Sequence, residues 1–356
     1  MILVLGDQHF GMRRNNLMFH KIMLKECEWF LEKVTKEDSV VILGDIFDSR
    51  SSVDFKILND AIDFYTNLIS KCKNVYMLVG NHDLYYKENM KENVNFRFLE
   101  KIRKIKLIQK LSEVKIEDKK CLFVPWVDSK KSRDKAISKL KNKYDVVFGH
   151  FDTCGIYGGN VEIDTAFDTK IFDNQDIVLS GHFHKRVDKE KVKYVGSFIN
   201  QTFNDVGETK GYHIIKEDGV EFIKNNSPLF EYITIDNTKQ FIEDFEENKE
   251  KYVSKYKGNI IKIFLNEYNK DNSEIIEMIK SIKPLDMSVS FNKTKIELEE
   301  EDSDFNGFDG KTNIVNVINE YIDEIEDKID SDNVSIEKIK SIINTKYVVY
   351  NNTMSA

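Results

Sequence analysis

The sequence of 356 residues predicts an α/β protein built around a layered core. Three observations support this: short aliphatic runs recur in the first half, each run ends at glycine, and amphipathic helical patterns lie between runs. Continuous apolar runs of this length are typical of strands buried on both faces. Strands that alternate with helices indicate an α/β core, and the chain length favours two or three domains.

Five of these runs are followed by a side chain that can bind a metal ion. In chain order the runs are "ILVLGD", "VVILGD", "VYMLVGN", "DVVFGH" and "DIVLSGH". The side chains that follow are Asp7, Asp45, Asn81, His150 and His182. Glycine lets the backbone turn sharply or approach another group closely. Because open α/β sheets place their sites at the carboxyl ends of the strands, we expect these side chains to share one edge.

Two amphipathic helix candidates span residues 17–34 and 55–70. The apolar residues of the second recur at helical spacing, which predicts a buried stripe. These residues are Phe55, Leu58, Ile62, Tyr65 and Ile69. The stretch from about 185 to 228 is rich in strand-forming residues and closes the core. Two histidines lack the glycine-led context, and we expect an exposed helix residue at His20 and a strand residue at His213.

The pattern changes after Pro228, which ends a first domain of residues 1–228. Residues 229–297 alternate strands and helices on a smaller scale, which predicts a small α/β capping domain. The acidic residues 298–310 indicate a linker, and residues 311–356 contain two short helices with apolar stripes. Such helices cannot bury their apolar faces well alone, so they either fold back on the body or dock onto a partner.

Charge is unevenly distributed along the chain. The net charge of −8 argues against a nucleic-acid partner, yet residues 101–143 carry 15 basic and 5 acidic side chains. Such a segment could follow phosphates, or it could be a solvated helical face. The four cysteines form no paired zinc spacing, no apolar run approaches a membrane span, and no secretion signal opens the chain. We therefore expect a cytoplasmic protein.

The glycine-led segments contain more metal-ligand candidates than one ion needs. The seven candidates are Asp7, His9, Asp45, Asn81, His150, His182 and His184. Oxygen and imidazole donors without thiolates suit Mn²⁺, Fe²⁺, Mg²⁺ or Zn²⁺. Two ions roughly 3.5–4 Å apart would use the whole set and could clamp a phosphoryl displacement. Asp45 is the expected bridge because its strand lies between the two clusters, and His182 and His184 would each reach a different ion.

His82 and Asp83 complete the predicted site. His82 follows the ligand Asn81, so its side chain should point away from the metals and toward the substrate. There it could stabilise developing charge or protonate the leaving oxygen. Asp83 could orient His82 as a neighbouring carboxylate does. The alternative for His82 is that it is only a neighbour of the ligands.

The segments "GDQH", "GDIFD", "GNHD", "GHF" and "GHFH", in this order, resemble those of the calcineurin-like metallophosphoesterases. Within that superfamily the chain is similar to SbcD-type nuclease subunits of double-strand-break processing complexes, including phage recombination nuclease subunits. The resemblance implies a layered β-sandwich core flanked by helices and two divalent ions, Mn²⁺ or alternatively Mg²⁺. It assigns Asp7, His9, Asp45 and His184 to the first ion. Asp45, Asn81, His150 and His182 would hold the second, with His82 as the catalytic histidine.

The same resemblance implies partners. They are double-stranded DNA ends, an SMC-like ABC ATPase of the SbcC type that binds the C-terminal helices, and a second copy of the chain. Dimerisation would use helices at about 55–70 and 84–104. Asp48 stands where archaeal and eukaryotic relatives carry a histidine, which places the chain with the bacterial type. The segment "FINQTFND" departs from the family pattern and leaves the substrate-facing loop open.

The sequence leaves three hypotheses for the function. The leading hypothesis is a metal-dependent DNA nuclease with exonuclease or endonuclease activity in recombination and repair. A second is another phosphoesterase of the same fold, either a protein phosphatase or a nucleotide phosphodiesterase. A third is a non-catalytic scaffold, although such a protein would be expected to lose ligands and all seven are present. The basic segment and the C-terminal layout favour the nuclease.

Overall fold

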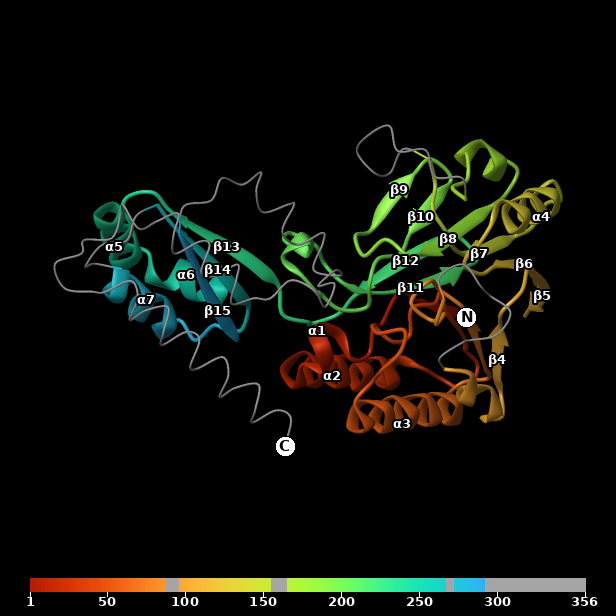
Figure 1. Ribbon diagram of the computed structural model, residues 1–356, viewed down its shortest axis with the longest axis horizontal. Coiled ribbons are helices and arrows are strands. Elements are labelled where there is room, and N and C mark those ends of the chain that lie inside the picture. Colours follow the sequence, from red (N-terminus) through yellow and green to blue (C-terminus); the bar gives the residue numbers. More distant parts are fainter. Residues whose placement is uncertain (87–95, 155–164, 267–271, 292–356) are drawn as a thin grey trace, which may run out of the picture. The chain divides into compact units, whose positions relative to one another are not determined.

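The computed structural model describes residues 1–86, 96–154, 165–266 and 272–291 (Figure 1). Two six-stranded sheets form the core of its first part. The first sheet has the order β12 (Gly219–Lys224), β11 (Gly211–Lys216), β1 (Ile2–Leu5), β2 (Ser39–Ile42), β3 (Asn74–Leu78) and β4 (Ile105–Ile108). The second has the order β5 (Ser112–Ile116), β6 (Lys119–Val124), β7 (Val146–His150), β8 (Ile177–Gly181), β10 (Val192–Tyr194) and β9 (Val187–Lys189).

Parallel pairing dominates the middle of each sheet. Strands β1 to β4 run parallel to one another, and so do β6, β7 and β8. All five predicted glycine-led strands are present among them, and the predicted β-rich stretch supplies β9 to β12. Parallel strands bring their carboxyl ends to one edge of a sheet, so the loops that follow these strands lie close together.

Alternate side chains of a strand face opposite sides of its sheet, and both sides are buried here, so the apolar runs are continuous. Ile2 and Val4 of β1 face the core between the two sheets, where they join Phe148 of β7. Leu3 and Leu5 face the other way, toward α2 (Leu17–Lys33) and α3 (Phe55–Lys71). The outer face of the second sheet packs against α4 (Lys130–Leu140) (Figure 1). The predicted layered sandwich flanked by helices is therefore confirmed.

Helix α2 corrects the prediction for His20. Asn16 caps the helix by accepting from the backbone N–H groups of Met18 and Phe19. His20 is buried, and its Nε2 lies 2.7 Å from Oδ2 of Asp60 on α3. The predicted exposed position was wrong because α3 packs against this face of α2. His213 lies in β11, as predicted.

Helix α3 begins at the predicted residue and ends one residue later than predicted, at Lys71, and its most buried face is rotated from the predicted stripe. Its buried residues are Ile57, Ala61, Phe64, Tyr65 and Leu68. Phe55, the first residue of the predicted stripe, is 80% exposed. The sequence contains consecutive apolar pairs such as Ile57–Leu58 and Phe64–Tyr65, so spacing alone does not say which member of each pair faces the sheet.

Residues 230–291 form a small parallel sheet with its own helices. The strands are β13 (Phe230–Ile235), β14 (Ile260–Leu265) and β15 (Asp286–Phe291), and the helices are α5 (Thr238–Glu247), α6 (Lys249–Tyr256) and α7 (Asn272–Ser281). Phe230 and Ile260 belong to the same apolar cluster as α2, and residues 1–293 form one compact unit. Independence of 229–297 stays a prediction, and the predicted linker and C-terminal helices lie outside the described residues.

Short elements and cysteines complete the description. The short helices are α1 (Met12–Asn15), η1 (Arg97–Lys101), η2 (Thr169–Phe172) and η3 (Phe203–Asp205). Cys27, Cys72 and Cys121 are free and buried, whereas Cys154 is free and exposed. Within the described residues, every helix is too short or too polar to cross a bilayer.

Two phenylalanines test the packing of the helical layer. Phe30 is 0% exposed and its ring contacts Phe198 and Tyr212. Phe30→Ala should lower the free energy of unfolding by about 3–5 kcal/mol, because it leaves a cavity. Phe55→Ala is the matched control and should change it by less than about 0.5 kcal/mol. Urea unfolding measures both; equal losses would contradict the observed rotation of α3.

Candidate metal centre

The seven predicted ligands come from loops at the facing edges of the two sheets. Asp7, Asp45 and Asn81 follow β1, β2 and β3 of the first sheet. His150 ends β7, and His182 follows β8 of the second sheet. The Nδ1 atom of His150 lies 2.6 Å from the carbonyl oxygen of Leu43, so the edges meet. The structure thus brings the predicted residues together.

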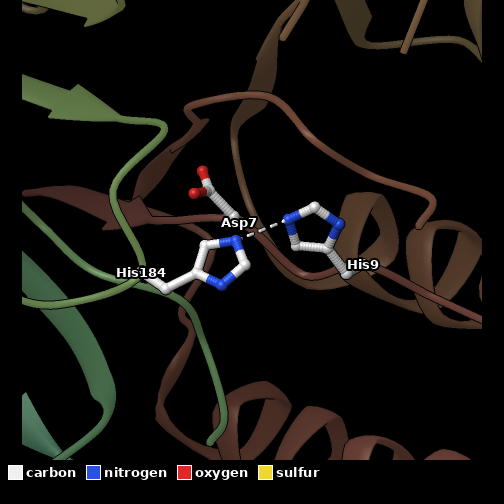
Figure 2. A group of neighbouring side chains, drawn as sticks. All are labelled: Asp7, His9 and His184. Carbon is white, nitrogen blue, oxygen red and sulfur yellow. Dashed lines mark hydrogen bonds between the residues drawn. The ribbon is translucent and has the colours of Figure 1, made fainter. Parts of the chain in front are cut away.

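A first group consists of Asp7, His9 and His184 (Figure 2). Their candidate ligand atoms all lie within 4.8 Å of one another. The Nε2 atoms of the two imidazoles are 3.1 Å apart. His9 has a φ of 51°, and its backbone N–H donates to the carbonyl oxygen of Asp45. This unusual conformation turns the ring of His9 into the site.

A second group consists of Asp45, His150 and His182, whose ligand atoms also lie within 4.8 Å. Asn81 belongs with it, because its Oδ1 is 2.9 Å from Nδ1 of His182 and 3.0 Å from Nε2 of His150. The two histidines one residue apart, His182 and His184, therefore reach different groups. The segment is not extended here, because the strand ends at Gly181 and His182 has a φ of 88°.

Asp45 lies between the two groups. Its Oδ2 atom is 3.6 Å from Nε2 of His9 and 3.4 Å from Nε2 of His150. Its Oδ1 atom accepts from the backbone N–H of His82 at 2.9 Å. One carboxylate oxygen thus faces an imidazole of each group while the other is fixed by the backbone. This is the arrangement that a bridging carboxylate needs.

Glycines let the loops approach Asp45 this closely. A Cβ atom at Gly80 would lie 2.2 Å from Oδ1 of Asp45, a distance that no side chain could accept. Gly44 has a φ of +103°, which side chains rarely adopt. The position of the carboxylate therefore requires glycine at position 80, and the backbone turn requires it at position 44.

Burial and nearby charges shift the pKa values of several groups in the site. Burial raises the pKa of Asp7 well above its usual value. Burial also opposes ionisation of Asp45, but nearby imidazoles outweigh it and hold its pKa well below the usual value. Burial lowers the pKa of His150, but the attraction of Asp45 and Asp7 outweighs it and raises the pKa to about 10. Burial lowers the pKa of His184 to about 4.

These groups fit a pair of divalent cations. Asp7 and Asp45 are 0% and 1% exposed, and buried carboxylates need positive charge close by. Neutral imidazoles, which burial favours at His9 and His184, are the form that binds metal. The donors are carboxylate, amide and imidazole, a mixture that suits hard or borderline divalent ions.

His82 lies beside the first group. The centroid of its ring is 4.8 Å from that of His9. Its Nδ1 lies 2.6 Å from the backbone carbonyl oxygen of Asp48, which can only accept, so Nδ1 carries the hydrogen. Nε2 is then the nitrogen available for proton transfer. His82 is also close enough to His9 and Asp45 to form a third potential ligand group.

The carboxylate of Asp83 binds backbone groups of two loops, and its orienting role for His82 stays a prediction. Its oxygens accept from the backbone N–H groups of Asp45, Ile46 and Gly80, at 2.7–2.8 Å. It joins the loops after β2 and β3, whereas the Asp48 carbonyl orients His82. Burial and the nearby Asp45 raise the pKa of Asp83 to about 7.

Asp152 was missed by the sequence reasoning. Its Oδ1 lies 2.8 Å from Nε2 of His182, so it fixes that ring while Nδ1 faces Asn81. The signal was present, since Asp152 follows His150 by two residues, with the same spacing as His182 and His184. The indole of Trp126 covers the same ring, with centroids 5.1 Å apart.

Comparisons with known proteins identify a family and several relatives of the chain. A family model described as calcineurin-like phosphoesterase matches residues 1–186. "Exonuclease subunit 1" of Enterobacteria phage T4 is 25% identical over 64% of this chain and 68% of its own length. "Putative phosphoesterase 078R" of Invertebrate iridescent virus 3 is 24% identical over 66% and 70%. The D subunit of the nuclease SbcCD from Staphylococcus epidermidis is 26% identical over 64% and 67%.

Metal binding should release protons. At neutral pH the raised pKa of His150, about 10, keeps this imidazole protonated until an ion displaces the proton. Affinity for Mn²⁺ should therefore rise as pH rises toward that value, by about ten-fold per pH unit for each proton released. Calorimetry at pH 7 in buffers of different ionisation enthalpy should detect at least one proton per chain. Release of none would contradict the charge state assigned to His150.

Proposed function

The chain belongs to the calcineurin-like phosphoesterase family, and we propose that it is a two-metal-dependent DNA nuclease that hydrolyses phosphodiester bonds. The observation that carries the two-metal part is the position of Asp45 Oδ2 between His9 and His150. Asp7, His9, Asp45 and His184 would hold one ion. Asp45, Asn81, His150 and His182 would hold the other.

The chain's own residues divide the chemistry between them. When bound, Mn²⁺ or Mg²⁺ ions would neutralise the phosphate and lower the pKa of a water molecule. His82, with Nδ1 held by the Asp48 carbonyl, would present Nε2 to the substrate. The attacking water, having lost one proton to solvent, would bond to phosphorus through its oxygen as the bond to the leaving sugar oxygen breaks. The imidazolium form of His82, protonated on both nitrogens, would donate its Nε2 proton to that sugar oxygen and become neutral. Asp83 would hold the loops that follow β2 and β3 at a fixed distance from each other.

Basic side chains on α4 support DNA as the substrate. Lys139 and Lys143 pair with acidic groups of the protein, at 2.7 Å and 2.9 Å. Lys130, Lys131 and Lys135 on the first turns of α4 are exposed, and the described part of the chain shows no ion pair for them. Helix α4 begins four residues after Trp126, which covers His182. These lysines could follow a phosphate backbone near the site.

The proposed assembly includes an ATPase and a second copy of the chain. Two relatives are named as subunits, of an exonuclease and of the SbcCD nuclease. We propose an SbcC-type ATPase, bound through residues 311–356, acting with this chain on double-stranded DNA ends in recombination and repair. Exposed Tyr85 and Tyr86, at the start of the second predicted dimer segment, support a dimer contact there, and the free cysteines support a cytoplasmic setting.

Loss of His82 tests the reaction. His82→Ala should keep its fold and its metal, but it should degrade linear double-stranded DNA with Mn²⁺ about 10²–10⁴-fold more slowly, because the proton donor is gone. The measurement is DNA degradation beside hydrolysis of a generic phosphate monoester. Monoester cleavage with DNA left intact would move the protein to the phosphatases. Wild-type rates in the variant would remove His82 from the mechanism.

Truncation tests the partner proposal. A chain lacking residues 305–356 should no longer co-elute with the ATPase, because the apolar stripes would be gone. The site loops of residues 1–228 are retained, so basal Mn²⁺-dependent hydrolysis should persist. Size-exclusion chromatography of the mixture and a DNA assay measure the two outcomes. Co-elution of the truncated chain would assign ATPase binding to another part of the protein.

A further inference from the structure

A buried ion pair lies next to the metal centre without belonging to the predicted ligands. Lys210 and Asp205 are 1% and 2% exposed, and Nζ lies 2.7 Å from Oδ1. Taking both charges out of water is costly, and an apolar pair of similar size would often be at least as stable. The pair therefore calls for an explanation beyond stability.

Lys210 also holds the backbone of His184. Its Nζ donates to the carbonyl oxygen of His184 at 2.5 Å, and the backbone N–H of Ser197 donates to the same oxygen at 3.0 Å. Two donors from different segments thus fix the peptide group of His184. The imidazole on that residue has its Nε2 3.1 Å from Nε2 of His9.

Asp205 extends the contact to the loop of His9. Its Oδ2 accepts from the backbone N–H groups of Gln201 and Thr202, at 2.8 and 3.1 Å. The carbonyl oxygen of Gln201 accepts from Nε of Arg13 at 2.8 Å. Arg13 lies in the turn that follows His9. The ion pair thus touches His184 directly and reaches the loop of His9 through two further hydrogen bonds.

We propose that Lys210 and Asp205 are positioning residues that set the spacing of His184 and His9 and so the affinity of the first metal ion. The inference rests on the two-metal function proposed above. Apart from the shared Asp45, the residues that would hold the second ion are held by other contacts: Asp152 binds His182, and the Leu43 carbonyl binds His150. We therefore expect the ion pair to affect the first ion more than the second.

The test removes both charges together, so that neither is left buried alone. Lys210→Met with Asp205→Asn should weaken the first Mn²⁺ by about 10–100-fold, the range typical of lost support around a metal ligand. The second Mn²⁺ should keep its affinity. Lys193→Met is the matched control, since Lys193 forms an ion pair of the same 2.7 Å length with Asp188 on the exposed surface. Calorimetric titration with Mn²⁺ alone is the readout.

Repeating the double substitution in a chain that already lacks His184 distinguishes a positioning role from a general effect on stability. In a His184→Ala chain the double substitution should change Mn²⁺ affinity by less than about 2-fold, because the ligand it positions is already absent. Lys210→Gln, which retains a donor, is the second variant in case the double variant does not fold. It should lose less affinity than the double variant and also spare the second ion.

The outcomes are distinct. Two ions bound by the double variant with wild-type affinities would overturn the positioning role. Equal weakening of both ions, or equal losses with and without His184, would also overturn it in favour of a structural role. A wild type that binds only one ion would overturn the two-metal function itself, and with it this inference, before any variant is compared.

Discussion

Two carboxylates at the bottom of the site, Asp7 and Asp45, are removed from water at the meeting edges of two sheets. Their negative charge must be balanced in place, because burying an unpaired ion costs several kcal/mol or more. The opposite sheet supplies His150, whose imidazole lies close to Asp45 and can balance its charge. Gly80 has no side chain, so the backbone of its loop can approach the Asp45 carboxylate. The sandwich is the scaffold that holds these loops face to face.

Much of this arrangement can be predicted from sequence because the constraint is local. Each ligand follows its strand directly, and parallel strands bring their ends to the same edge, so the five glycine-led runs specify both strands and site. Because these runs are apolar throughout, they also predict that each strand is covered on both faces of its sheet. The seven ligand candidates and His82 all lie at this edge, although their roles as ligands and catalyst stay predictions.

Other features of the fold and site depend on contacts between segments far apart in the chain, and the spacing of residues in the sequence does not predict such contacts. The buried face of α3 is decided by packing, since both members of its apolar pairs satisfy a helical pattern. His20 is buried because Asp60 on another helix meets it. Asp83 and Asp152 are ordinary carboxylates in sequence, and only the fold shows that one joins two loops and the other holds His182. The buried pair of Lys210 and Asp205 is hidden for the same reason.

We propose that the carboxylate of Asp45 would join two metal ions. Electron paramagnetic resonance of the protein loaded with Mn²⁺ is the sharpest test of this bridge, because ions that share a bridging carboxylate are magnetically coupled. We expect two Mn²⁺ per chain with a coupled signal, which Asp45→Asn should weaken or abolish. A single Mn²⁺ per chain, or two ions with the uncoupled signal of isolated Mn²⁺, would contradict it.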